Sequence, residues 1–282
     1  MILARTRDEL EAALAGGMVE GNRRALVPTM GALHEGHLSL FDLASAAASQ
    51  VVVSIFVNPL QFDRDSDLAA YPRSLERDLE LAESRGVDVV FAPDAEELYP
   101  GGEPQVTVEP GPLGDRLEGA FRPGHFRGVL TVVAKLFHLV RPDVAVFGSK
   151  DFQQVALVRR MVDDLDFPLE IMVGETVRDP DGVALSSRNL HLDPDQRRAA
   201  TALSRALAAG AAAAEADAAV APVLSRMRDS LAEETGVQVE YLEIVDPRTL
   251  EAVPRIVPGS VAVLACHVGP VRLIDNLVLG RS

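Results

Sequence analysis

The sequence has little of three things that would point to particular classes of protein: cysteine, long apolar runs and net positive charge. Its single cysteine, Cys266, excludes a framework of intramolecular disulfides and fits a reducing compartment. No run of about 18 apolar residues is present, so no transmembrane helix is predicted. The N-terminal segment also lacks the apolar core of a signal peptide. We therefore expect a cytoplasmic protein that does not bind membranes.

The chain has no net positive charge: 27 Lys and Arg side chains face 42 Asp and Glu, which gives a formal net charge of −15. Nucleic acids and anionic membranes are bound largely through Lys and Arg that neutralise phosphate, so neither is an expected partner. An anionic ligand would have to be met by cations gathered in one place. Lysine is rare, since Lys135 and Lys150 are the two in the chain. Lys150 stands out because arginine is the usual cation of this sequence.

Apolar residues are abundant enough for a sizeable core, since 48% of the 282 residues are hydrophobic. Short apolar runs predict strands, and helical patterns such as those at 7–16, 73–85 and 125–140 separate most of them. This alternation predicts a Rossmann-like α/β fold, with a parallel sheet flanked by helices. The predicted strands are 25–27, 51–57, 87–91, 143–147 and 169–173, with a weaker one at 106–108.

The pattern changes after about residue 176. An alanine-rich helical stretch at 195–219 is followed by three segments that alternate or run apolar, with turns between them. Such segments predict a small antiparallel sheet. We therefore expect two domains, a Rossmann-like domain at 1–175 and a smaller α+β domain at 176–282. The three predicted strands of the second domain are 237–245, 261–268 and 271–279.

The most specific segment, 24–41, is predicted to run from a strand through a loop into a helix. Pro28 and Gly31 are predicted to end the strand, and His34 and His37 to flank the first turn of the helix. Residues three apart share a helix face, and the free N–H groups at a helix start attract phosphate. Two imidazoles there could donate to one anion, which favours a nucleotide site.

Two simpler interpretations of these histidines stay open. Histidines three apart can ligate zinc, although no cluster of Cys, His and Glu elsewhere in the sequence obviously completes such a site. They can also be cap or surface residues.

In open parallel sheets, ligands bind beyond the carboxyl ends of strands. The polar loops at 28–34, 58–62 and 148–151 all follow predicted strands, so we expect them at one edge of the sheet.

Five segments, in order along the chain, closely resemble the pantothenate synthetase family of His-x-Gly-His nucleotidyltransferases. They are 29–37 with its His-Glu-Gly-His, 56–62 with Asn-Pro-Leu-Gln-Phe, 122–126 with Arg-Pro-Gly-His-Phe, 148–154 with Lys-Asp-Phe-Gln-Gln, and 186–189 with Ser-Ser-Arg-Asn. The resemblance implies condensation of (R)-pantoate with β-alanine, driven by ATP, to give pantothenate, AMP and pyrophosphate through a pantoyl adenylate. It also implies a cytoplasmic homodimer that uses Mg²⁺. The first domain would bind nucleotide and pantoate, and the second would act as a lid.

The same resemblance assigns residues to each substrate. It implies His37 as a proton donor. His34 and Lys150 join the catalytic set because such donors can stabilise charge on phosphate oxygens and departing pyrophosphate. No residue is assigned to a metal. The implied substrate-binding residues, for pantoate and β-alanine, are Gln61, Gln154 and Asn58. The implied ATP-binding residues are Met30, Gly31, Ala32, Leu33, His34, Glu35, Gly36, His37, Gly148, Ser149, Lys150, Asp151, Val177, Leu185, Ser186, Ser187 and Arg188.

The sequence departs from the family pattern in a few places. Ser149 and Phe152 replace the Glu and Tyr of many members, Leu185 replaces a common Met, and Arg77-Asp78 replaces a familiar acidic pair.

Two other functions stay open beside the condensation of pantoate with β-alanine. Another nucleotidyltransferase of the superfamily would transfer a nucleotide to a phosphorylated acceptor. Its acceptor pocket would need cations, whereas Gln61 and Gln154 are neutral. A non-catalytic nucleotide-binding module would keep the site without turnover.

Overall fold

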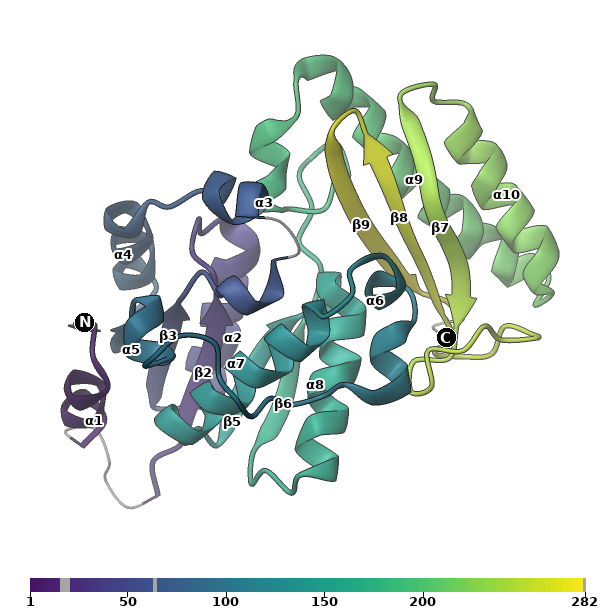
Figure 1. The fold of residues 1–282 in the computed structure, drawn as a ribbon. Coiled ribbons are helices and arrows are strands. Elements are labelled where there is room, and N and C mark those ends of the chain that lie inside the picture. Colours follow the sequence, from purple (N-terminus) through teal and green to yellow (C-terminus); the bar gives the residue numbers. More distant parts are fainter. Residues whose placement is uncertain (16–20, 63–64, 281–282) are drawn as a thin grey trace. The chain divides into compact units, whose positions relative to one another are not determined.

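The structure is a computed structural model that describes residues 1–15, 21–62 and 65–280. It divides into two compact units (Figure 1). One comprises Met1–Ser149 and Gln154–Glu175, and the other comprises Lys150–Gln153 and Thr176–Ser282. In the described parts of the chain, no helix combines the length and hydropathy needed to cross a bilayer.

The N-terminal unit is built on a six-stranded sheet with the order β1-β4-β3-β2-β5-β6. Every recorded strand pair in it is parallel. This arrangement confirms the predicted α/β class. The strands are β1 (Ile2–Ala4), β2 (Arg24–Thr29), β3 (Gln50–Ile55), β4 (Val89–Phe91), β5 (Val144–Gly148) and β6 (Glu170–Gly174).

Helices cover both faces of this sheet, because successive side chains of a strand point to opposite sides. Val52 packs in the same core as Leu130 of α7, whereas Val53 packs with Phe41 of α2 on the other face. The α-helices are α1 (Arg7–Ala15), α2 (Glu35–Ala47), α3 (Asp65–Ala70), α4 (Leu75–Ser84), α5 (Ala95–Leu98), α6 (Glu118–Phe121), α7 (His125–Val140) and α8 (Phe152–Asp164). The 3-10 turns are η1 (Pro59–Gln61), η2 (Gly111–Asp115) and η3 (Ser149–Asp151).

The strand order reverses between β2 and β5. Pairing of β2 with β3 runs from Arg24 to Thr29, whereas its pairing with β5 is recorded at Ala25 and Leu26. Pro28 therefore lies inside β2, and the prediction that it ends the strand is wrong. Proline lacks a backbone N–H, and this is tolerated because Pro28 lies beyond the part of β2 that pairs with β5. Ligands bind at such a reversal in open α/β sheets.

In the C-terminal unit, two helices pack on a three-stranded antiparallel sheet of order β7-β8-β9. The helices are α9 (Pro194–Ala216) and α10 (Val220–Ala232), preceded by the 3-10 turn η4 (Ser187–His191). The strands are β7 (Val237–Val245), β8 (Val261–Val268) and β9 (Val271–Val278), which confirms the predicted antiparallel sheet.

Three local features differ from the sequence predictions. The run at 106–108 is not a strand: the Val108 N–H donates to Thr131 Oγ1 at 3.0 Å, and Val106 is 86% exposed. A side chain of α7 thus takes the place of a strand partner. The sequence patterns also predict neither α10 nor β1. The short strand β1 is stabilised by its pairing with β4, which is remote in sequence.

Candidate active site

The loop between β2 and α2 carries the two histidines at the start of α2. His34 is the residue before the helix and His37 is its third residue, which confirms their predicted placement. Their ring centroids lie 4.1 Å apart. The backbone N–H of His34 donates to His37 Nδ1 at 3.3 Å, so the neutral His37 ring carries its proton on Nε2. His37 therefore offers an N–H donor through Nε2.

A buried carboxylate from α4 holds this loop. Asp78 is 1% exposed, and it accepts the N–H groups of Ala32 at 2.9 Å and Leu33 at 2.8 Å. Gly31 has a φ of +80°, and a Cβ there would lie 2.9 Å from Asp78 Oδ2. Glycine is thus required at this point of the loop. No role for Asp78 is predicted from the sequence. The signal that could have indicated its burial is its position four residues before the apolar Ala82, on the same face of α4.

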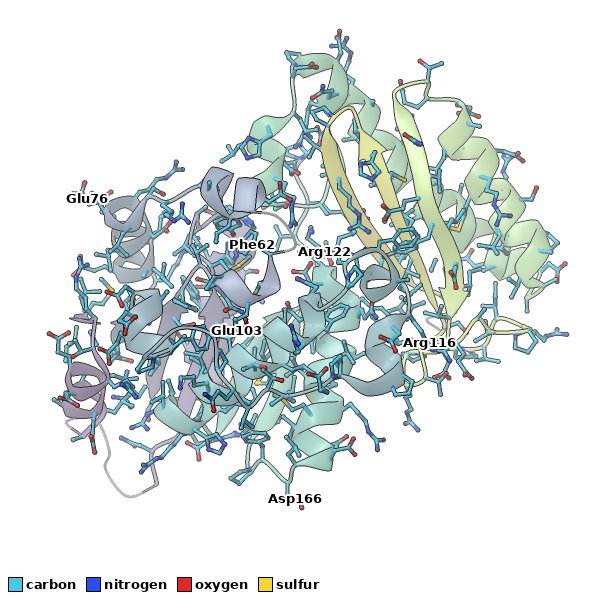
Figure 2. The ribbon with its side chains drawn as sticks, viewed as in Figure 1. Phe62, Glu76, Glu103, Arg116, Arg122 and Asp166 are labelled. Carbon is cyan, nitrogen blue, oxygen red and sulfur yellow. The ribbon has the colours of Figure 1, made fainter. Side chains whose placement is uncertain are left out.

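Gln61 lies in η1, just after β3, and is 9% exposed. Its Nε2 lies 3.3 Å from Met30 Sδ, so the predicted substrate amide touches the predicted ATP loop. Its backbone carbonyl accepts from His125 Nδ1 at 2.9 Å and from Arg122 Nη2 at 3.2 Å, with Arg122 labelled in Figure 2. A Cβ at Gly128 would lie 2.3 Å from the Leu60 carbonyl oxygen, so α7 approaches this turn through a glycine.

Asn58 is 1% exposed and is held by protein groups on both sides of its amide. Its Nδ2 donates to Gln61 Oε1 at 3.0 Å and to the Gly128 carbonyl at 3.1 Å. Its Oδ1 accepts from the Leu60 N–H at 3.3 Å and from the Tyr99 hydroxyl at 2.9 Å. Asn58 therefore supports Gln61, and its own contact with substrate stays a prediction. Tyr99 is a residue of this network that the sequence analysis missed.

In the C-terminal unit, Lys150 and Ser186 line one cavity together with Asn189 and Asp275. The Lys150 side chain is 18% exposed, and its Nζ lies 3.8 Å from Asp151 Oδ1. Its backbone carbonyl accepts from Asn276 Nδ2 at 2.9 Å. The structure thus brings together two residues that were both predicted to bind ATP.

The other predicted residues of this unit lie in the segments around that cavity. The Leu185 N–H donates to the Val177 carbonyl at 2.9 Å. Ser186 Oγ accepts from the Arg188 N–H at 3.3 Å and so caps η4, which contains Ser187 and Arg188. In the N-terminal unit, Gly148 ends β5, Ser149 begins η3, Gln154 is half-buried in the first turn of α8, and Glu35 and Gly36 lie in the first turn of α2.

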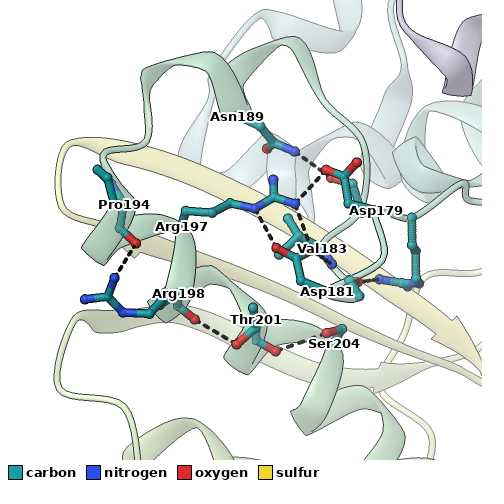
Figure 3. Close-up of polar contacts among 12 residues, drawn as sticks. Asp179, Asp181, Val183, Asn189, Pro194, Arg197, Arg198, Thr201 and Ser204 are labelled. Carbon is teal, nitrogen blue, oxygen red and sulfur yellow. Dashed lines mark hydrogen bonds and ion pairs between the residues drawn. The ribbon is translucent and has the colours of Figure 1, made fainter.

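The turn at 179–182 is fastened by two arginines. Arg178 donates to the buried Asp275 carboxylate at 2.7 and 2.9 Å. Arg197 of α9 reaches Asp179 at 2.6 Å and Asp181 at 2.8 Å (Figure 3). The hydrogen bond from Arg197 lowers the pKa of Asp181 and, reciprocally, raises the pKa of Arg197. Ion pairs therefore attach the turn that precedes Ser186 to β9 and to α9.

These features define a doubly wound α/β protein with a His-x-Gly-His helix start beside the reversal in strand order. The family model described as pantoate-beta-alanine ligase matches residues 2–278. A protein of Nocardioides sp. named pantothenate synthetase is 57% identical, over 99% of this chain and 85% of that protein. The chain belongs to the pantoate-beta-alanine ligase family.

Solved structures agree with this assignment. The crystal structure of pantothenate synthetase from Thermus thermophilus is similar, with a TM-score of 0.93 and 47% identity over 99% of both chains. Pantoate-beta-alanine ligase from Francisella tularensis has a TM-score of 0.82 and 33% identity, over 99% of this chain and 97% of that one. That protein was crystallised in complex with β-γ ATP and β-alanine.

Proposed function

We propose that the chain condenses (R)-pantoate with β-alanine to pantothenate while ATP is cleaved to AMP and pyrophosphate. The route passes through pantoyl adenylate. The observation that supports this proposal most directly is the contact between Gln61 Nε2 and Met30 Sδ at 3.3 Å. It joins a neutral amide to the loop that leads into a helix start suited to phosphate. The ATP analogue and β-alanine in the Francisella complex are ligands of the kind this arrangement would take.

In the first step, a carboxylate oxygen of pantoate attacks the α-phosphorus of ATP, and pyrophosphate leaves. Negative charge builds on phosphate oxygens, where preorganised donors are most effective. His37 offers Nε2–H and His34 lies beside it, at a helix start whose free N–H groups attract phosphate. Lys150 supplies the cation. We assign the ATP-binding role to the predicted residues from Met30 to His37, from Gly148 to Asp151, and to Val177 and Leu185 to Arg188.

In the second step, the amine of β-alanine attacks the acyl carbon of the adenylate. The new C–N bond forms, the bond from that carbon to the phosphate oxygen breaks, and AMP leaves as the nitrogen loses a proton. Alignment of two small substrates contributes much of the acceleration in such a reaction. Gln61 and Gln154 suit this task because an amide binds an oxygen without adding charge to the site.

Mg²⁺ is proposed to accompany ATP. In the described residues, no group of three or more His, Cys, Asp or Glu side chains is arranged to hold a metal ion. This fits Mg²⁺, which is commonly held by substrate phosphates and water with few protein ligands. When bound, the ion would neutralise phosphate charge. The protein groups that face the same charge would be His34, His37 and Lys150.

The organisation of the active protein is proposed as well. We assign nucleotide and pantoate binding to residues 1–175 and a lid role to residues 176–282, in a cytoplasmic homodimer. Light scattering of the purified protein measures its mass in solution. A mass of one chain, at concentrations where the enzyme is active, would contradict the homodimer.

Release of AMP tests the reaction itself. With ATP, pantoate and β-alanine, the protein should form AMP and pantothenate in equal amounts, measured by chromatography, and omission of either acceptor should stop pantothenate formation. Another nucleotidyltransferase would release pyrophosphate and keep the nucleotide joined to its acceptor. A non-catalytic module would bind ATP and form no product.

A further inference from the structure

Tyr99 begins a chain of hydrogen bonds that ends at Gln61. Tyr99 is 5% exposed, and its ring packs edge-on against Phe56 with centroids 5.9 Å apart. Its hydroxyl donates to Asn58 Oδ1 at 2.9 Å, although the two residues are 41 positions apart. Asn58 Nδ2 in turn donates to Gln61 Oε1 at 3.0 Å.

Backbone groups fix the direction of these bonds. The Gly128 carbonyl can only accept, so the nitrogen of the Asn58 amide faces it, at 3.1 Å. The Leu60 N–H can only donate, so the oxygen of that amide faces it, at 3.3 Å. The second hydrogen on Asn58 Nδ2 is then directed to Gln61, which must turn Oε1 toward it. Gln61 is left with Nε2 on the other side, next to Met30.

The Tyr99 hydroxyl makes the shorter of the two bonds to Asn58 Oδ1, at 2.9 Å against 3.3 Å for the backbone N–H. Burial raises the pKa of Tyr99 well above its ordinary value, so the hydroxyl keeps its proton at any working pH. Without this hydroxyl, Asn58 Oδ1 keeps only the longer bond from the Leu60 N–H, and the amide is held less firmly although its Nδ2 still donates to the Gly128 carbonyl. Gln61 could then turn its oxygen toward the substrate.

We propose that Tyr99 is a positioning residue that acts through Asn58 to hold Gln61 as a hydrogen-bond donor toward the substrate. This proposal rests on the proposed role of Gln61 in binding pantoate. An amide N–H suits a carboxylate or hydroxyl oxygen and cannot accept from an ammonium group. The geometry thus assigns the Gln61 N–H to an oxygen atom and not to the amine of β-alanine. Under the proposed role of Gln61, that oxygen belongs to pantoate or its adenylate.

The test compares Tyr99→Phe, Gln61→Ala and the double variant. Tyr99→Phe keeps the ring that packs on Phe56 and removes one hydrogen bond. Since such a bond contributes about 0.5 to 1.5 kcal/mol, KM for pantoate should rise roughly 3- to 10-fold. kcat and the dissociation constant for ATP should stay within about twofold, as they should in the control Tyr241→Phe, which removes a phenol hydroxyl from β7. In the Gln61→Ala background, Tyr99→Phe should add almost nothing, because the pair acts as one unit.

The outcomes separate the two proposals. If Gln61→Ala leaves KM for pantoate unchanged, the role of Gln61 fails and the inference on Tyr99 fails with it. If Gln61→Ala raises KM but Tyr99→Phe does not, or if the two effects simply add, the inference alone is overturned. Parallel losses for ATP and pantoate would mark Tyr99 as a structural residue and also overturn it. Asn58→Ser is a second variant that removes the donor to Gln61, and it should show the same pantoate-specific, non-additive change.

Discussion

Asp78 accepts the backbone N–H of Leu33 at 2.8 Å, although 45 positions separate the two residues in the chain. The same carboxylate accepts the N–H of Ala32, so both of its oxygens fix the loop that leads to the histidines. Asn at this position can accept through one oxygen only and would turn an NH₂ group toward a backbone N–H. An unmatched buried group of this kind costs roughly 1 to 3 kcal/mol.

We therefore expect Asp78→Asn to weaken ATP binding about tenfold and to lower the melting temperature. Calorimetric titration with ATP measures the first effect. Glu80→Gln, an exposed change in the same helix, is the matched control and should alter neither quantity. Normal ATP affinity in Asp78→Asn would show that the loop keeps its shape without the carboxylate.

The adenylation step can be isolated by exchange of pyrophosphate into ATP. This exchange should require pantoate and proceed without β-alanine, because the first step is complete before the amine reacts. His34→Ala, His37→Ala and Lys150→Ala should each lower its rate roughly 10²-fold or more. His138→Ala, an exposed change in α7, should not. Exchange that strictly needed β-alanine would favour a concerted reaction instead.

Gln61→Glu should weaken the use of pantoate and leave the affinity for ATP nearly unchanged. The new carboxylate has nearly the shape of the amide, but when ionised it cannot donate, and it would lie beside the carboxylate of pantoate. Repulsion and the unmatched polar group should weaken pantoate use at least about tenfold. ATP affinity should stay within a few-fold. Titration with each ligand decides the matter, and a parallel fall in both affinities would remove Gln61 from the substrate side.

The anchor of the 179–182 turn can be tested through the buried Asp275, whose side chain is 2% exposed. Asp275→Asn breaks its ion pair with Arg178 and should reduce the free energy of unfolding by about 2 kcal/mol. Hydrogen exchange of the turn should become faster. Asp195→Asn removes the partner of Arg198 on the surface of α9, where the side chain is 84% exposed, and should have little effect. Equal effects of the two changes would contradict a special role for Asp275.

Cys266 should be inert in the folded protein. It is 0% exposed, and burial raises the pKa of its thiol to about 12. At pH 8 the thiol is neutral, so a thiol reagent should modify it only on unfolding. Because the folded pKa is raised, its contribution to stability is complete below the ordinary pKa of 9.0 and is lost as pH rises toward about 12. Rapid labelling of the native protein at pH 8 would contradict this placement.

Much of the fold can be predicted from local sequence patterns. Except for β1, the strands of both sheets follow from apolar runs, and helices such as α7 follow from helical periodicity, which depends on residues close together in the sequence. The placement of His34 and His37 at a helix start follows in the same way, because a strand, a glycine and a helical pattern all lie within one short segment. The pattern misjudged 106–108, where an apolar alternation meets Thr131 of α7 instead of another strand.

The sequence by itself determined the α/β class and the family, and the site residues taken from it stay predictions. The tertiary structure decided the strand order, the partners of Asp78 and the network from Tyr99 to Gln61. A buried polar side chain must find a partner wherever the packed chain supplies one, and those partners lie 41 and 45 positions away. Periodicity records only which face of an element is buried. Which polar groups meet there is settled when remote helices and strands pack together.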